Sequence, residues 1–188
     1  MAEVTVAPEE FTVVFFDSGR IAALAGEVAD KVGLAPGSEL RVEVKENEPL
    51  GRTTIESLEP IVITVEGGAF EDARRPRHMS EKSVVDVLGR LLFKARDRLD
   101  PAFADAPADD ALDLQQHTAW EAYCVGRCAR AGMSPAKSRR LYHFRNRHGF
   151  TDVADAVFER LWIAEGLGWA DLQAACAETA AAREPASA

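Results

Sequence analysis

The sequence has few cysteines and no long apolar run. Three cysteines, an odd number, cannot form a complete disulfide framework, which favours a reducing compartment. No apolar stretch approaches the roughly 18 residues that a membrane-spanning helix needs, and residues 1–17 carry acids where a signal peptide needs basic residues. The sequence therefore predicts a soluble cytoplasmic protein that makes no membrane contact.

Basic residues are also scarce. The chain has 22 Lys and Arg against 31 Asp and Glu, and its formal net charge is −9 at pH 7. Such a charge repels a polyanion unless positive residues are concentrated locally, which argues against a general nucleic-acid coat protein. With 188 residues, 47% of them hydrophobic, the chain can bury an ordinary core without disulfide or metal crosslinks.

Strand patterns are confined to the first third of the chain. The β-branched and aromatic run at 11–16 predicts a strand that is covered on both faces. An apolar stripe predicts a helix over 18–33, ended by Gly33. Further strands are expected at 39–46, where apolar and charged residues alternate, and at 61–65. The intervening residues 46–52 are expected to form a turn or a short extra strand. Residues 1–70 are thus predicted to form a β-α-β-β lobe.

From Ser80 onward apolar residues recur at helical spacing. The expected helices cover 80–100, 111–131, 135–148, 152–165 and 169–182. The predicted fold class is α+β, with a small mixed β-sheet packed against a helical C-terminal half of about five helices. We expect an α/β lobe over 1–70 and an all-helical lobe over 80–183 that share one core, followed by a disordered tail at 184–188.

Positive charge is concentrated in residues 134–150, which hold five Lys and Arg and no acid, while the rest of the chain has 17 basic and 31 acidic residues. On a helix, Leu141, Phe144 and His148 form a stripe that faces the core. A second stripe consists of Arg140, His143 and Arg147, widened by Arg139 and Asn146. We hypothesise that this stripe docks an acidic protein surface or a phosphorylated small molecule held by arginine forks. The alternative is that it pairs with the protein's own acids, such as those at 105–110.

RNA is a third hypothesis for this segment, since arginines and aromatic rings together bind bases and phosphates. It is the least favoured, because Phe144 falls on the core stripe and Phe150 is expected to make the hydrophobic contact that follows the Gly149 helix cap. Only Tyr142 would then be free to stack.

A second basic cluster, Arg74, Arg75, Arg77 and His78, lies between a predicted buried strand and a helix capped by Ser80. Free N–H groups at a helix start favour an anion at such a place. The competing interpretation pairs these cations with the nearby acids Glu66, Glu71, Asp72 and Glu81.

An enzyme is the alternative to a binding protein. In it His78 or His143 would perform acid–base chemistry beside Arg75, Arg77 and Arg140, which would stabilise an anionic transition state. The binding or adaptor protein is preferred, because no nucleophile–base–orienter pattern can be read in the sequence.

The predicted helix 111–131 carries four potential metal ligands, His117, Glu121, Cys124 and Cys128, on the same face as Trp120. They suggest a zinc site or a cysteine nucleophile, but four ligands over three turns span about 16 Å, too far for one ion. We therefore expect no metal or cofactor, two cysteines in the core, and a hydrogen bond between His117 and Glu121. The opposite face holds small residues, Ala119, Ala122, Gly126 and Ala129, which predict the close approach of another backbone.

Overall fold

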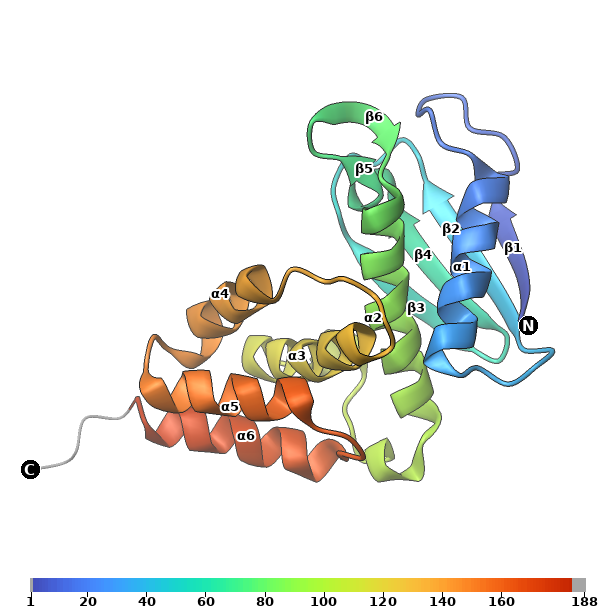
Figure 1. Cartoon of the computed structure of the whole chain (residues 1–188). Helices are drawn as coiled ribbons and strands as arrows, with labels where there is room; N and C mark the ends of the chain where they lie inside the picture. The colour runs from blue at the N-terminus through green and yellow to red at the C-terminus, as the bar shows by residue number, and fades with distance from the viewer. Residues whose placement is uncertain (1, 184–188) are drawn as a thin grey trace, which may run out of the picture. The chain divides into compact units, whose positions relative to one another are not determined.

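The computed structural model describes residues 2–183, so the predicted disordered tail at 184–188 lies outside the described residues. The chain divides into two compact units, an N-terminal unit, Met1–Arg96, and a C-terminal unit, Asp97–Ala188. That the two lobes share one core stays a prediction. The α+β class is confirmed: a four-stranded mixed sheet comes first and helices follow (Figure 1).

The sheet of the N-terminal unit has the strand order β1-β2-β4-β3. Its strands are β1 (Glu3–Ala7), β2 (Glu39–Lys45), β3 (Thr53–Leu58) and β4 (Ile61–Glu66). β1, β2 and β4 are mutually parallel, and β3 returns antiparallel to β4. The strands predicted at 39–46 and 61–65 are confirmed, with Leu40, Val42 and Val44 buried on one face of β2.

Helices α1 (Ser18–Val32) and α2 (Glu81–Leu99), most of which belongs to this unit, cover one face of the sheet (Figure 1). Both were predicted. α1 ends at Gly33, whose φ of 77° places it in the left-handed region that glycine adopts without strain. At the start of α2 the Ser80 hydroxyl accepts a hydrogen bond from the backbone N–H of Ser83 (3.1 Å), as the capping pattern requires.

The strand predicted at 11–16 is wrong. The first strand is instead β1, Glu3–Ala7, which pairs with β2. It is a shorter segment, in which polar and apolar residues alternate. Residues 11–16 form a loop rather than a strand of this sheet, because the N–H groups of Thr12 and Val13 donate to the Glu46 carboxylate (2.9 and 2.7 Å). The apolar run is also not covered on both faces, since Val14 is buried while Phe15 is 70% exposed.

The connection from β4 to α2 contains a short hairpin, β5 (Glu71–Asp72) and β6 (Arg75–Met79), which was not predicted. β6 also bridges the 11–16 loop, where the N–H of Phe15 donates to the carbonyl of Arg77 (2.8 Å). The predicted basic loop is therefore an ordered hairpin at the same end of the sheet as the first loop (Figure 1).

In the C-terminal unit four helices pack together. They are α3 (Leu114–Arg130), α4 (Lys137–His148), α5 (Asp152–Ile163) and α6 (Trp169–Ala181), preceded by the short 3₁₀ turns η2 (Pro101–Phe103) and η3 (Asp109–Ala111). Thr151 caps α5, because its hydroxyl accepts the N–H of Ala154 (3.1 Å). The small-residue face predicted for α3 is confirmed: a Cβ built on Gly126 would lie 2.1 Å from the carbonyl oxygen of Trp162 in α5.

Candidate anion-binding sites

The cations of α4 divide into two groups. Three of them pair with acids of the same unit, namely Arg140 with Glu121 (2.6 Å), Lys137 with Glu159 (2.6 Å) and Arg145 with Asp155. For these three the interpretation of self-pairing holds, although the acids lie on α3 and α5 rather than at 105–110. Arg140, a member of the predicted binding stripe, thus has a charge that Glu121 already balances.

The other predicted stripe residues, Arg139, His143 and Arg147, are exposed. Within the described part of the chain, the side chains of Arg139 and Arg147 form no ion pair. The charge of these two guanidinium groups is therefore available to an external anion.

A groove of about 440 Å³ lies between the first turn of α3 and the last two turns of α4. It is lined by Leu114, His117, Thr118, His143, Asn146 and Arg147. Two imidazoles, a guanidinium and a carboxamide thus share one concave surface, and none of the six residues is acidic. Arg139 is not among them, although it lies on the same side of α4 one turn before His143.

The acids that flank this groove are engaged. Asp113 caps α3 and accepts a hydrogen bond from the N–H of Gln116 (2.7 Å), and Glu121 accepts one from Arg140 (2.6 Å). Because hydrogen bonds and an opposite charge already satisfy these carboxylates, they compete little for Arg147. The groove can offer several donors to a single oxyanion.

The core stripe predicted for α4 is confirmed for Phe144 and His148, which are 1% and 0% exposed, while Leu141 is half-buried. The expectation for Phe150 is wrong. Its ring is 65% exposed and makes an edge contact with Tyr142, which is 58% exposed (6.2 Å between centroids). The backbone leaves α4 at Gly149 with a φ of 101°, and the next side chain points away from the core.

The cluster of four potential metal ligands does not exist as predicted. Cys124 and Cys128 are buried, whereas His117 is exposed and Glu121 bonds to Arg140. The expected His117–Glu121 hydrogen bond stays a prediction. This face of α3 is buried in the core at its C-terminal end, whereas at its N-terminal end it lines the groove. Among the described residues, no group of three or more His, Cys, Asp and Glu side chains is arranged to hold a metal ion.

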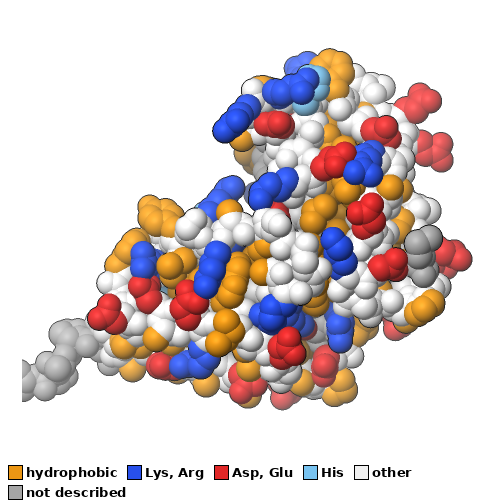
Figure 2. Space-filling view, in the orientation of Figure 1, with side chains coloured by type: hydrophobic (Ala, Val, Ile, Leu, Met, Phe, Trp, Pro, Cys, Tyr) orange, Lys and Arg blue, Asp and Glu red, His pale blue; other side chains and the backbone are white. Residues whose placement is uncertain are grey.

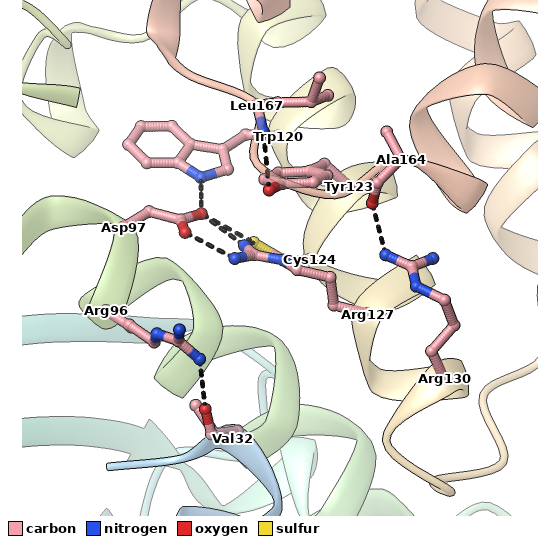
Figure 3. Close-up of polar contacts among 10 residues, drawn as sticks. All are labelled: Val32, Arg96, Asp97, Trp120, Tyr123, Cys124, Arg127, Arg130, Ala164 and Leu167. Atoms are coloured by element: carbon pink, nitrogen blue, oxygen red, sulfur yellow. Dashed lines mark hydrogen bonds and ion pairs between the residues drawn. The ribbon is translucent and has the colours of Figure 1, made fainter. Parts of the chain in front are cut away.

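The buried partner of this face is Asp97, which sequence analysis missed (Figure 3). Its carboxylate, 4% exposed, accepts hydrogen bonds from the Trp120 indole (2.7 Å) and from Arg127 (2.7 and 2.5 Å). Burial, reinforced by the adjacent Asp97, raises the pKa of the Cys124 thiol well above its ordinary value, so this cysteine is a protonated core residue and a poor nucleophile.

The second predicted cluster lies on the β5–β6 hairpin of the N-terminal unit. Arg74, Arg75 and Arg77 are exposed, and His78 is half-buried. Figure 2 shows basic, histidine and hydrophobic side chains together at this end of the unit. It belongs to a different unit from the α4 groove, so the two clusters are treated as separate surfaces.

The competing interpretation paired these arginines with nearby acids. In the structure, Glu66, Asp72 and Glu81 have other partners. Glu81 pairs with Arg20 (2.7 Å), and Glu66 accepts the backbone N–H of Arg52 (2.9 Å). Asp72 accepts the backbone N–H of Arg74 (2.8 Å). Within the described residues, the guanidinium groups of the hairpin form no ion pair.

Comparison of the chain with protein-family models, with curated proteins and with solved structures gives no significant match. Of the helices in residues 2–183, none combines the length and apolar character that crossing a bilayer requires.

Proposed function

We propose that the chain is a non-enzymatic binding protein whose α3–α4 groove holds the phosphate group of a phosphorylated ligand. The observation that supports this most directly is the meeting of His117, His143 and Arg147 in one groove, while other cations of α4 are neutralised by acids. A phosphate carries three strong acceptor oxygens and is well matched to several convergent donors.

The size of the groove supports a small ligand or a short phosphorylated segment. A volume of about 440 Å³ is within the usual range of small-molecule sites, about 300–1,000 Å³. An acidic protein surface, the other partner considered, would instead be expected to engage the whole exposed stripe of α4, including Arg139 outside the groove.

The residues of the groove favour binding over catalysis. Its one hydroxyl, that of Thr118, donates back to the Leu114 carbonyl of its own helix (2.5 Å) and is not aimed at an imidazole base in the groove. Catalysis by His78 or His143 remains the alternative hypothesis, and Arg140 contributes little to it because Glu121 neutralises its charge.

Titration of the ¹⁵N-labelled protein with inorganic phosphate at constant ionic strength tests the proposal. We expect amide shifts confined to the first turn of α3 and the last two turns of α4. Arg147→Gln and His143→Gln should each weaken phosphate binding about tenfold, the effect of losing one charge-assisted hydrogen bond of 1.4 kcal/mol or more.

Arg139→Gln is the matched control, because it removes an exposed, unpaired arginine of the same helix that does not line the groove. It should leave phosphate binding unchanged. An equal loss with Arg139→Gln would point to an extended acidic partner, and the absence of phosphate-dependent shifts at the groove would refute the proposal.

A further inference from the structure

A second surface lies on the N-terminal unit, where three loops meet at the carboxyl ends of the parallel strands. β1, β2 and β4 run in the same direction, and each is followed at this edge by a loop, residues 8–17, 46–52 and 67–79 respectively. Helices α1 and α2 begin at the same edge (Figure 1). In open sheets with parallel strands, ligands bind outside this edge.

The loops are joined by specific bonds. The Glu46 carboxylate of the second loop accepts the N–H groups of Thr12 and Val13 and the Thr12 hydroxyl (2.9, 2.7 and 3.1 Å). These hydrogen bonds lower the pKa of Glu46, and the bond from the Val13 N–H has the largest effect. The first loop is in turn bonded to the hairpin through the N–H of Phe15 and the carbonyl of Arg77 (2.8 Å). The three loops are therefore connected to one another by hydrogen bonds.

An aromatic ring stands out from this surface. Phe15 is 70% exposed and stacks on the His78 imidazole, with 4.9 Å between ring centroids and 26° between planes. Exposure of a large apolar ring costs solvation free energy, and one face of this ring is held by the stack on His78 while its backbone is bonded to the hairpin. A fixed, exposed ring is a platform on which another flat group can stack.

Cations lie on the hairpin that is bonded to the Phe15 backbone. Arg74, Arg75 and Arg77 are exposed on the adjoining hairpin, and their neighbouring acids are engaged by other partners, Glu81 by Arg20 and Asp72 by a backbone N–H. Their combined positive charge contrasts with the unit as a whole, in which residues 1–96 contain 17 acids and 12 basic residues. A local anion is favoured here, but a long polyanion would be repelled beyond the hairpin.

We propose that this surface binds a nucleotide, with its base stacked on Phe15 and its phosphate held by Arg75 and Arg77. A flat π-system attached to a phosphate matches both features of the surface, whereas an acidic peptide matches only the charge. The nucleotide is either a free nucleoside phosphate or part of a short single strand. This site is independent of the α3–α4 groove, since it uses other residues in the other unit.

Binding is measured with two probes, a short labelled oligouridylate by fluorescence anisotropy and adenosine triphosphate by calorimetry. We expect at least one of them to bind at low ionic strength. Phe15→Leu, which keeps an apolar side chain but removes the ring, should weaken binding about fivefold or more, as loss of one stacking contact does. Arg75→Gln and Arg77→Asn should each weaken it as well. Asparagine is chosen for position 77, whose φ is 63°, because it tolerates the left-handed region.

Lys31→Gln is the control, since Lys31 is an exposed cation in the last turn of α1, at the other end of that helix. It should leave both affinities unchanged, and circular dichroism verifies that every variant folds. Binding of adenosine triphosphate assigns a free nucleotide, and binding of oligouridylate alone assigns a single strand. The proposal is overturned if neither probe binds, if tripolyphosphate or polyglutamate binds as tightly, or if Phe15→Leu changes nothing. Loss of phosphate binding at the α3–α4 groove would leave these outcomes unaffected.

Discussion

Gly126 of α3 and Trp162 of α5 approach each other so closely that a Cβ on the glycine would lie 2.1 Å from the tryptophan carbonyl oxygen and 2.8 Å from its Cα. The contact is backbone against backbone, so no side-chain rotation can relieve an added methyl group. Around it Arg130 of α3 donates to the carbonyls of Trp162 and Ala164, and the hydroxyl of Tyr123 accepts the N–H of Leu167 (3.1 Å). The crossing of α3 and α5 therefore depends on the absence of one side chain.

Gly126→Ala should destabilise the C-terminal unit by about 3 kcal/mol, the upper range for overpacking a core, despite the higher helix propensity of alanine. All three tryptophans, Trp120, Trp162 and Trp169, belong to this unit, so urea unfolding followed by tryptophan fluorescence measures the effect. Gly26→Ala in α1 is the matched control, because its Cβ would have only an ordinary contact, 4.0 Å from Val4. Since Met1–Arg96 contains no tryptophan, its unfolding is followed by far-UV circular dichroism. This control substitution should be neutral or stabilising by up to about 1 kcal/mol. A neutral Gly126→Ala would show that the two helices can separate without cost.

The α4 stripe should respond unequally to charge reversal. Arg140→Glu places a carboxylate against Glu121, since these side chains now bond at 2.6 Å and are each about one fifth exposed (21% and 22%). We expect a loss of roughly 1–2 kcal/mol, more than an exposed pair contributes, because this pair is partly buried. Arg147→Glu, at a position without an ion pair, should change the free energy of unfolding by less than about 0.5 kcal/mol. Equal effects in urea unfolding would contradict this division of the stripe.

The helices could be predicted because their signals are local. Apolar spacing and the caps Gly33 and Ser80 depend on residues within a few positions of each other, and both caps were found in the structure. The strand at 11–16 failed because composition alone does not supply a pairing partner. The N–H groups of Thr12 and Val13 bond to Glu46, more than 30 residues away, and no local pattern contains that contact.

The candidate sites could be predicted only in part, because local patterns do not show which residues from different elements come together. The exposure of His143 and Arg147 follows from the period of α4, but the groove needs His117 and Thr118 from another helix. His117 was assigned to the core with Cys124 and Cys128 because one helical face was treated as uniform along its length. The exposed ring of Phe15 was missed because an aromatic run ordinarily indicates burial.

The buried carboxylate of Asp97 should be critical for stability. Asp97→Asn leaves the guanidinium of Arg127, whose side chain is 14% exposed, without its counter-charge. We expect a loss of about 3–5 kcal/mol, the usual cost of removing one partner of a buried pair. The double variant Asp97→Leu/Arg127→Met should be more stable than Asp97→Leu alone, because no uncompensated charge then remains. Arg139→Ala, at an exposed position of α4, is the comparison and should cost less than about 0.5 kcal/mol. A loss below about 1 kcal/mol for Asp97→Asn in urea unfolding would mean that water reaches Arg127.

His148 should make the C-terminal unit sensitive to acid. The ring is 0% exposed, stacks on Phe144 at 3.8 Å, and lies between the Thr179 hydroxyl (Nδ1, 2.7 Å) and the Gln115 carbonyl (Nε2, 3.0 Å). In a neutral ring Nε2–H donates to the carbonyl and Nδ1 can accept the Thr179 hydroxyl proton, for which the Cys176 carbonyl competes (2.9 Å).

Burial lowers the pKa of His148, with a further lowering by Arg183, against opposing effects of the Gln115 carbonyl and Asp113. The unfolded chain therefore binds the proton first as the pH falls. Stability is fully present above the unfolded pKa of about 6.5 and declines below it until the lower folded pKa is reached, with a slope of at most about 1.4 kcal/mol per pH unit. His148→Gln should be less stable at neutral pH but should lose this part of the slope, and the difference between the two urea-unfolding curves isolates it from the exposed histidines. Parallel pH dependences in the two proteins would show that His148 already carries a proton in the folded state.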